Sequence, residues 1–149
     1  MYFVNREKIE KTLHFIEELL KTFPTERELH TFNTYEKLAL ERVNYLLIES
    51  IIDVGNSMID GFIMRDPGSY EDIIDILVDE KVMEESDGLS LKALILLRKP
   101  LVQAFIEIDH QPIWNQYRKS FASISGFPQQ IRRYLVEELG PVSAFLPQE

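Results

Sequence analysis

Six polar side chains recur at the spacing that places them on one side of a helix: Arg42, Tyr45, Glu49, Asp53, Asn56 and Asp60. At about 100° per residue, these positions fall within roughly 80° of one another. Most residues between them are apolar, so a helix here must be buried on several sides and present one polar line, called the polar seam below. Carboxylates aligned with an arginine and a tyrosine could pair with a cationic side chain, line a groove or bind a metal ion.

Three interpretations of the polar seam are open. It is the strip of a central helix that reaches water, which is the common arrangement in a helical bundle. Alternatively, it is the wall of a groove or a subunit interface, where Glu49 and Asp53 would need an arginine or another donor opposite them. A metal site is the third interpretation, weakened by the lack of two histidines at helical spacing. We therefore expect neither a metal nor a cofactor.

The remaining reactive residue types do not form a recognisable catalytic pattern. His14, His30 and His110 lie in different segments without ligand-like spacing, so we expect surface or hydrogen-bonded residues rather than catalysts. No nucleophile-elbow pattern supports a Ser-His-Asp triad. The chain has no cysteine, which excludes disulfides and thiolate chemistry and favours a reducing, cytoplasmic location.

Capping residues and prolines predict where the first two helices begin and end. Asn5 can cap a first helix that Pro24 stops. Asn33, with Glu36 three residues later, has the form of a capping box. The helix that it opens runs to about Gly61 and carries the polar seam.

Similar signals predict further helices in the second half of the chain. Ser69 opens a short helix, and another follows residues 86–88 until a kink or break at 98–100, where Pro100 disfavours helix. Pro112 and Pro128 each suit the first turn of a helix, and Gly140-Pro141 ends the pattern. With no strand-like alternation, we predict an all-α, antiparallel bundle of five to six helices.

Length and charge limit the classes of function. At 149 residues, the chain fits one domain, residues 1–149. Its formal charge of −9 argues against broad attraction to nucleic acid or anionic lipid, so any RNA contact must be local. We expect no membrane association, because the chain has neither a secretory signal nor an apolar run long enough to span a bilayer.

Three segments together carry a further signal: Asp53-Val54-Gly55-Asn56, the stretch from Pro67 to Leu77, and the stretch from Leu97 to Phe105. In order and spacing they resemble the HepT-like family of the HEPN superfamily. The segment Asp60–Tyr70 is most similar to the YutE-like branch of that family. The resemblance implies an all-α homodimer, and in many members a metal-independent endoribonuclease toxin restrained by a partner nucleotidyltransferase.

The family motif is Arg, four residues, His, one residue, Tyr, and this chain departs from it twice. Arg98 occupies the arginine position, whereas Gln103 and Phe105 stand where the histidine and tyrosine belong. An arginine can clamp a phosphate, but a carboxamide cannot take the proton of a ribose 2′-hydroxyl near neutral pH. Phe105 lacks the hydroxyl that accepts nucleotidyl groups from the family's partner enzyme.

Each motif position also has a structural interpretation. Arg98 could simply form an ion pair with the polar seam, and Asp53 is the residue that we first expect to face it. Gln103 would then be a polar residue beside a kink, and Phe105 an aromatic residue packed in the core.

These observations support one leading hypothesis about function and two others. The leading hypothesis is a homodimeric binding protein with weak or no ribonuclease activity and a local RNA groove. The second is an active endoribonuclease toxin paired with a nucleotidyltransferase, in which Arg98 works with Glu49 or Asp53. The third is a structural subunit of a larger assembly.

Overall fold

The computed structural model describes residues 2–140, which form six α-helices and one short 3₁₀ turn, with no strand in that range. This confirms the predicted all-α fold. The elements are α1 (Arg6–Leu20), η1 (Leu29–Thr31), α2 (Thr34–Gly61), α3 (Tyr70–Asp79), α4 (Glu85–Ile95), α5 (Arg98–Gln103) and α6 (His110–Leu139).

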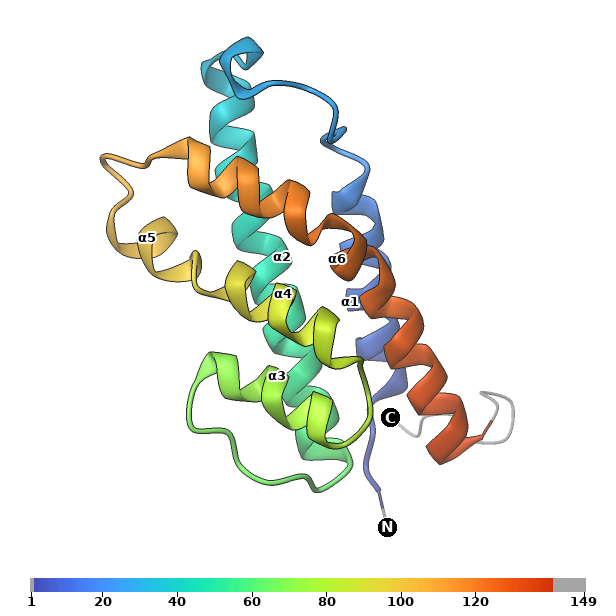
Figure 1. The fold of residues 1–149 in the computed structure, drawn as a ribbon. Coiled ribbons are helices and arrows are strands. Elements are labelled where there is room, and N and C mark those ends of the chain that lie inside the picture. The colour runs from blue at the N-terminus through green and yellow to red at the C-terminus, as the bar shows by residue number, and fades with distance from the viewer. Residues whose placement is uncertain (1, 141–149) are drawn as a thin grey trace.

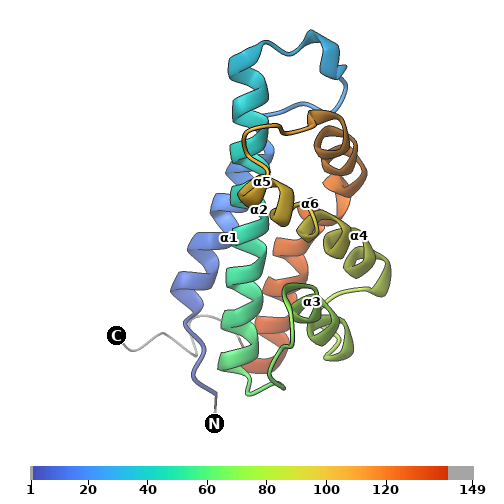
Figure 2. The ribbon, with the colours of Figure 1, turned by 90° about the vertical axis from the view of Figure 1, so that its left-hand side faces the viewer.

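The long helix α2 is the centre of the bundle (Figures 1 and 2). It returns antiparallel beside α1, and both helices contact α6. The short helices α3 and α5 also pack on α2, while α4 bridges α3 and α6. As a result, α2 is buried on several sides, as its apolar sequence predicts. No helix in the described range is both long and apolar enough to cross a membrane.

Three of the predicted helix caps are present. The Asn5 side chain accepts a hydrogen bond from the backbone N–H of Lys8. At α2, the Asn33 side chain accepts from the Glu36 backbone and the Glu36 carboxylate accepts from the Asn33 backbone, which completes the capping box.

The third cap, Ser69, accepts from the backbone N–H of Asp72 at the start of α3. At the other end of the chain, Gly140 terminates α6, while the predicted stop at Pro141 lies outside the described residues.

The fourth helix differs from its prediction at both ends. Residues 86–88, which were predicted to precede this helix, lie inside its first turn. Gly88 packs closely on α3 there, because a Cβ at this position would come within 2.6 Å of Val78 Cγ2. The predicted break lies at 96–97 instead of 98–100, because Pro100 falls in the first turn of α5. Proline is tolerated there, since the first turn needs no N–H donor.

The prediction that Pro128 begins a separate helix is wrong, because Pro128 lies inside the 30-residue helix α6. Proline removes one hydrogen bond of the helix and bends it. Figures 1 and 2 show the bend, with the N-terminal half of α6 running across the bundle and the C-terminal half running alongside α1.

Candidate functional site

Arg98 begins α5, directly after the turn at residues 96–97 that separates it from α4. Its Nε donates a hydrogen bond to Oε2 of Glu49 on α2 at 2.9 Å, and the arginine side chain is 26% exposed. This hydrogen bond is the main cause that raises the pKa of Arg98 above its ordinary value. The guanidinium is therefore a permanent cation at the edge of the bundle.

Tyr70 covers one face of this guanidinium. The guanidinium carbon of Arg98 lies 4.6 Å from the centre of the Tyr70 ring, within the range of a cation–π interaction. Tyr70 is the first residue of α3 and is 45% exposed. No side chain or carbonyl in the described range accepts a hydrogen bond from the two terminal nitrogens of Arg98. These donors are available for a ligand.

Tyr45 extends this group of residues along α2. Its hydroxyl donates to Oε1 of Glu49 at 3.4 Å, and the guanidinium carbon of Arg42 lies 5.6 Å from the centre of its ring. We call Arg42, Tyr45, Glu49, Arg98 and Tyr70 the arginine cluster. Glu49 is its centre, because one carboxylate contacts both Tyr45 and Arg98.

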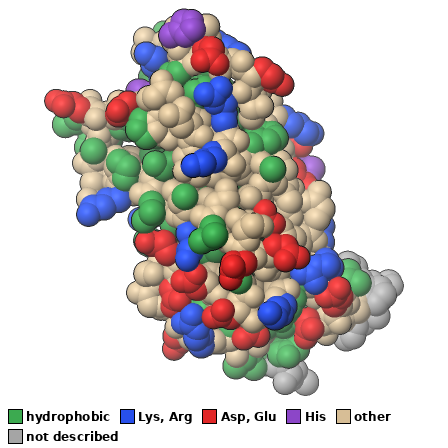
Figure 3. All heavy atoms as spheres, viewed as in Figure 1, with side chains coloured by type: hydrophobic (Ala, Val, Ile, Leu, Met, Phe, Trp, Pro, Cys, Tyr) green, Lys and Arg blue, Asp and Glu red, His purple; other side chains and the backbone are tan. Residues whose placement is uncertain are grey.

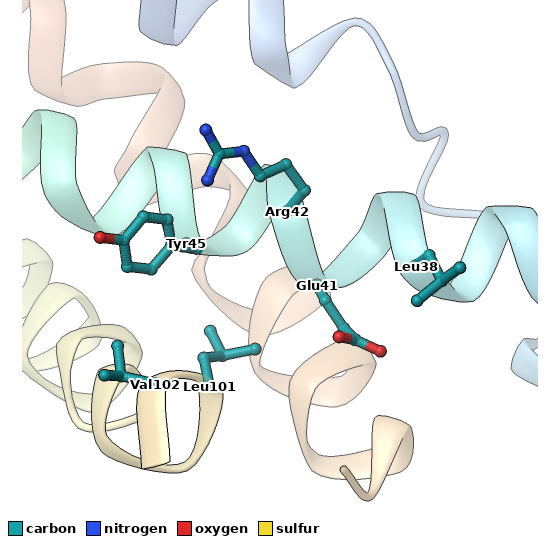
Figure 4. A pocket seen from close by; sticks show the side chains of 6 residues that line it. All are labelled: Leu38, Glu41, Arg42, Tyr45, Leu101 and Val102. Atoms are coloured by element: carbon teal, nitrogen blue, oxygen red, sulfur yellow. The ribbon is translucent and has the colours of Figure 1, made fainter. Parts of the chain in front are cut away.

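A groove of about 370 Å³ adjoins the arginine cluster between α2 and α5. Figure 4 shows its walls, formed by Leu38, Glu41, Arg42 and Tyr45 on α2 and by Leu101 and Val102 on α5. The groove therefore combines an apolar wall with charged and hydroxyl groups. Such a lining offers a ligand both apolar contact and hydrogen-bonding groups.

His110 and Glu41 form a second polar contact near this groove. His110 Nε2 lies 2.7 Å from Glu41 Oε2, and both side chains are about four-fifths buried, with 20% and 22% exposed. The contact joins α6 to α2. His110 is thus a hydrogen-bonded, partly buried residue, as the sequence analysis expects.

The structure brings only part of the polar seam into the arginine cluster. Asp53, which we expected to face Arg98, instead lies 3.7 Å from Lys8 on α1, with both side chains about half exposed. The expectation was wrong because α5 crosses α2 one turn earlier, at Glu49. Asn56 and Asp60 continue toward the C-terminal end of α2, where Asp60 is exposed and Asn56 is half-buried.

Comparisons with known proteins place this geometry in a family. The model of the "Ribonuclease HepT-like" family matches residues 9–131. This chain belongs to the HepT-like ribonuclease family. The protein named "Putative RNase YutE" from Bacillus subtilis (strain 168) is 52% identical over 145 residues, which cover 97% of this chain and 99% of that protein.

A solved structure of a HepT-like relative supports the same assignment. It is YutE from Bacillus subtilis, described as a cytosolic protein of unknown function, with a TM-score of 0.89 and 52% identity. The match covers 97% of this chain and 100% of that chain. The HEPN-like helical bundle predicted from the sequence is thereby confirmed.

The other two motif positions of the HepT-like resemblance lie at the surface. Gln103 is exposed at the end of α5, and Phe105, in the turn that follows, is 66% exposed. The expectation that Phe105 packs in the core was wrong, because α5 ends before it and the chain turns away from α2. In the described range, neither side chain forms a hydrogen bond or an aromatic contact with the arginine cluster.

Sequence reasoning missed two contributors to the site. Tyr70 is part of the segment that resembles the family, but no spacing rule connects it to Arg98, which lies 28 positions later in the chain. The apolar wall of Leu101 and Val102 was missed because it exists only once α5 packs against α2. Both contacts are tertiary, so helix periodicity does not reveal them.

Proposed function

We propose that this chain is a homodimeric RNA-binding protein of the HepT-like family with weak or no ribonuclease activity. The observation that carries the proposal is Arg98, a partly exposed cation whose terminal nitrogens have no acceptor in the described range. A guanidinium presented in this way can bind a phosphate through two parallel hydrogen bonds. Its position beside a groove supports a local phosphate contact despite the net charge of −9.

Weak catalysis follows from the lack of a suitable base at the motif position Gln103 and from the position of His110. A general base must lie within hydrogen-bonding reach of the 2′-hydroxyl proton, and Gln103 has no usable pKa near neutrality. His110 contacts Glu41, eight residues before Glu49 on α2, which corresponds to about 12 Å along the helix axis. The only histidine near the groove is therefore held two turns away from the residue that pairs with Arg98.

An RNA-cleavage assay with three proteins tests this proposal. Wild type should bind single-stranded RNA and cleave it little above background, whereas Gln103→His should gain cleavage by about a hundred- to ten-thousand-fold, the usual contribution of a general base. The third protein, the double variant Gln103→His with Arg98→Ala, should lose that gain. Strong cleavage by wild type that disappears in Arg98→Ala would contradict the proposal.

A second candidate function is an active, metal-independent endoribonuclease toxin with a nucleotidyltransferase partner. The contact of Glu49 with Arg98 favours it, because a carboxylate beside the phosphate clamp could serve as the base. The name "Putative RNase YutE" of the relative is consistent with it. This function predicts growth arrest when the chain is overproduced alone, and arrest should be lost with Arg98→Ala.

The homodimer is supported by an exposed apolar edge at α5 and the turn after it. Val102, Phe105 and Ile106 are 42%, 66% and 85% exposed. Figure 3 shows hydrophobic side chains on this side of the molecule, while acidic side chains gather over α3, α4 and the end of α6. Contiguous apolar surface of this kind commonly marks a protein interface. A second copy packed here would border the groove beside Arg98.

A further inference from the structure

Two arginines lie against two tyrosine rings on either side of Glu49. Arg98 lies against Tyr70 with 4.6 Å from its guanidinium carbon to the ring centre, and Arg42 lies against Tyr45 with 5.6 Å. We propose that Arg42 and Tyr45 form a second nucleotide-binding subsite, beside a first formed by Arg98 and Tyr70. The inference rests on the proposed RNA binding, and it states in addition that the RNA strand runs along α2.

The charge of Arg42 is available for a phosphate. Arg42 is exposed on α2 and makes no ion pair with any residue in the range 2–140. The neighbouring carboxylate of Glu41 also lines the groove, but it is engaged by His110 at 2.7 Å. An exposed arginine without a carboxylate partner can replace the counterions of a phosphate.

The positions of the two arginines along α2 fit two different phosphates. Arg42 precedes Glu49, the partner of Arg98, by seven residues, or about 10 Å along the helix axis. Each guanidinium also lies against a different tyrosine ring, Tyr45 for Arg42 and Tyr70 for Arg98. The two subsites therefore fit two positions along one strand.

The aromatic rings favour single-stranded RNA. Tyr45 lines the groove of about 370 Å³, and Tyr70 is 45% exposed. Bases of a single strand can stack on such rings with little sequence preference, whereas a duplex keeps its bases stacked inside. A chain with a net charge of −9 also lacks the broad basic surface that duplex binding requires.

Salt-dependent binding measures the contribution of Arg42. The probe is a short single-stranded RNA that contains 2-aminopurine, titrated with the purified full chain at several salt concentrations. Arg42→Gln removes one phosphate contact. The slope of log affinity against log salt concentration should therefore be shallower by about 0.7 than that of wild type. Lys119→Gln is the matched control, because this exposed lysine on α6 carries the same charge and should leave the slope unchanged.

Fluorescence of the same probe measures base stacking on Tyr45. Stacking on an aromatic ring quenches 2-aminopurine, so Tyr45→Leu should reduce the quenching. Tyr45→Phe should retain it, because it keeps the ring and loses only the hydroxyl contact to Glu49. A purely structural role of the hydroxyl would reduce the quenching in both variants, because each of them loses the contact to Glu49.

The results distinguish this inference from the proposed function. If wild type does not bind the RNA, both fail. If wild type binds and Arg98→Gln weakens binding, but Arg42→Gln keeps the wild-type salt slope, the second subsite alone is wrong. A shallower slope for Arg42→Gln, together with lost quenching for Tyr45→Leu in a variant that keeps the helical circular dichroism spectrum, supports it.

Discussion

Glu49 has two opposing effects on Arg98. Its hydrogen bond to Nε orients the guanidinium against Tyr70 and fixes the direction of the terminal nitrogens. The same carboxylate places a negative charge beside the position where we expect a phosphate to bind. Since Glu49 is 35% exposed, solvent screens much of this repulsion. Its role can therefore be separated from that of Arg98 by removing the charge and keeping the shape.

We predict that Glu49→Gln strengthens RNA binding about two- to fivefold, the range expected for one partly screened charge interaction. The amide oxygen can still accept from Arg98 Nε, so the orientation of the guanidinium is retained. Fluorescence anisotropy with a labelled single-stranded RNA measures the change. In the alternative in which Glu49 is the base of an active nuclease, the same substitution would eliminate RNA cleavage.

Glu36 should make folding dependent on pH in the acid range. The Arg27 guanidinium and then the Asn33 backbone N–H lower its pKa from the ordinary 4.5 to about 2. A carboxylate with a lowered pKa in the folded state stabilises the fold above pH 4.5, and that contribution disappears as the pH falls toward 2. Urea unfolding should therefore show wild type more stable than Glu36→Gln at pH 7, with the difference shrinking below pH 4.5. A difference that does not change with pH would exclude this origin.

The identity of the partner of Arg98 shows the limit of sequence reasoning at the residue scale. Helix periodicity correctly places Glu49 and Asp53 on one face of α2, and the family resemblance selects Arg98. The choice between these two acids depends on where α5 crosses α2, a contact between residues 49 positions apart in the chain. No local pattern encodes that crossing point.

The C-terminus of α2 contains backbone strain at an unusual residue. Ile63 has φ of 57°, and the Met64 N–H donates to the Ile59 carbonyl at 2.9 Å, which is the hydrogen bond of a Schellman motif. Glycine is the usual residue at this position, because a β-branched side chain in the left-handed region clashes with the backbone. Ile63 is 71% exposed, so burial of its side chain offsets little of this backbone strain.

Replacing Ile63 with glycine should stabilise the fold by about 0.5–1 kcal/mol, which is the relief of left-handed strain less the entropy cost of glycine in the unfolded chain. Urea unfolding measures the difference. Ile63→Val is the matched control, because it keeps the β-branch and should leave stability unchanged. If valine stabilises as much as glycine, the cause is loss of exposed apolar surface and not the backbone.

Helix α6 shows why proline rules predicted an extra helix end. The Asp87 carboxylate on α4 accepts from Ser123 Oγ at 2.8 Å and from Gln130 Nε2 at 3.0 Å, so one side chain holds α6 on both sides of Pro128. Tertiary contacts of this kind keep the helix continuous across a residue that locally disfavours it. By contrast, the caps at Asn5, Asn33 and Ser69 are predictable, because donor and acceptor lie within three residues.

The net charge of −9 and the acidic side chains on one face agree with local RNA binding. Acidic side chains gather in the lower half of the face shown in Figure 3, over α3, α4 and the end of α6. Such a surface repels nucleic acid that comes within the Debye length, which is about 8 Å at physiological salt. RNA is therefore expected to bind only where the arginine cluster presents two cations beside a groove.

The apolar edge at α5 leads to a prediction about assembly. If Val102, Phe105 and Ile106 form the homodimer contact, a charge at Ile106, which is 85% exposed, should separate the subunits without unfolding them. Light scattering coupled to size-exclusion chromatography should find wild type as a dimer and Ile106→Asp as a monomer at micromolar concentration. Leu89→Asp is the matched control, since Leu89 is an apolar residue on α4 that is 62% exposed.

The two variants also connect assembly to the site. The apolar edge includes Val102 of α5, the helix that carries Arg98, and the turn after it. Loss of the dimer should therefore weaken RNA binding in Ile106→Asp, whereas Leu89→Asp should leave it unchanged. A dimer that persists in Ile106→Asp and dissociates in Leu89→Asp would move the interface to α4. In that case the groove between α2 and α5 would belong to one subunit, and Arg98 would act without a contribution from the second copy.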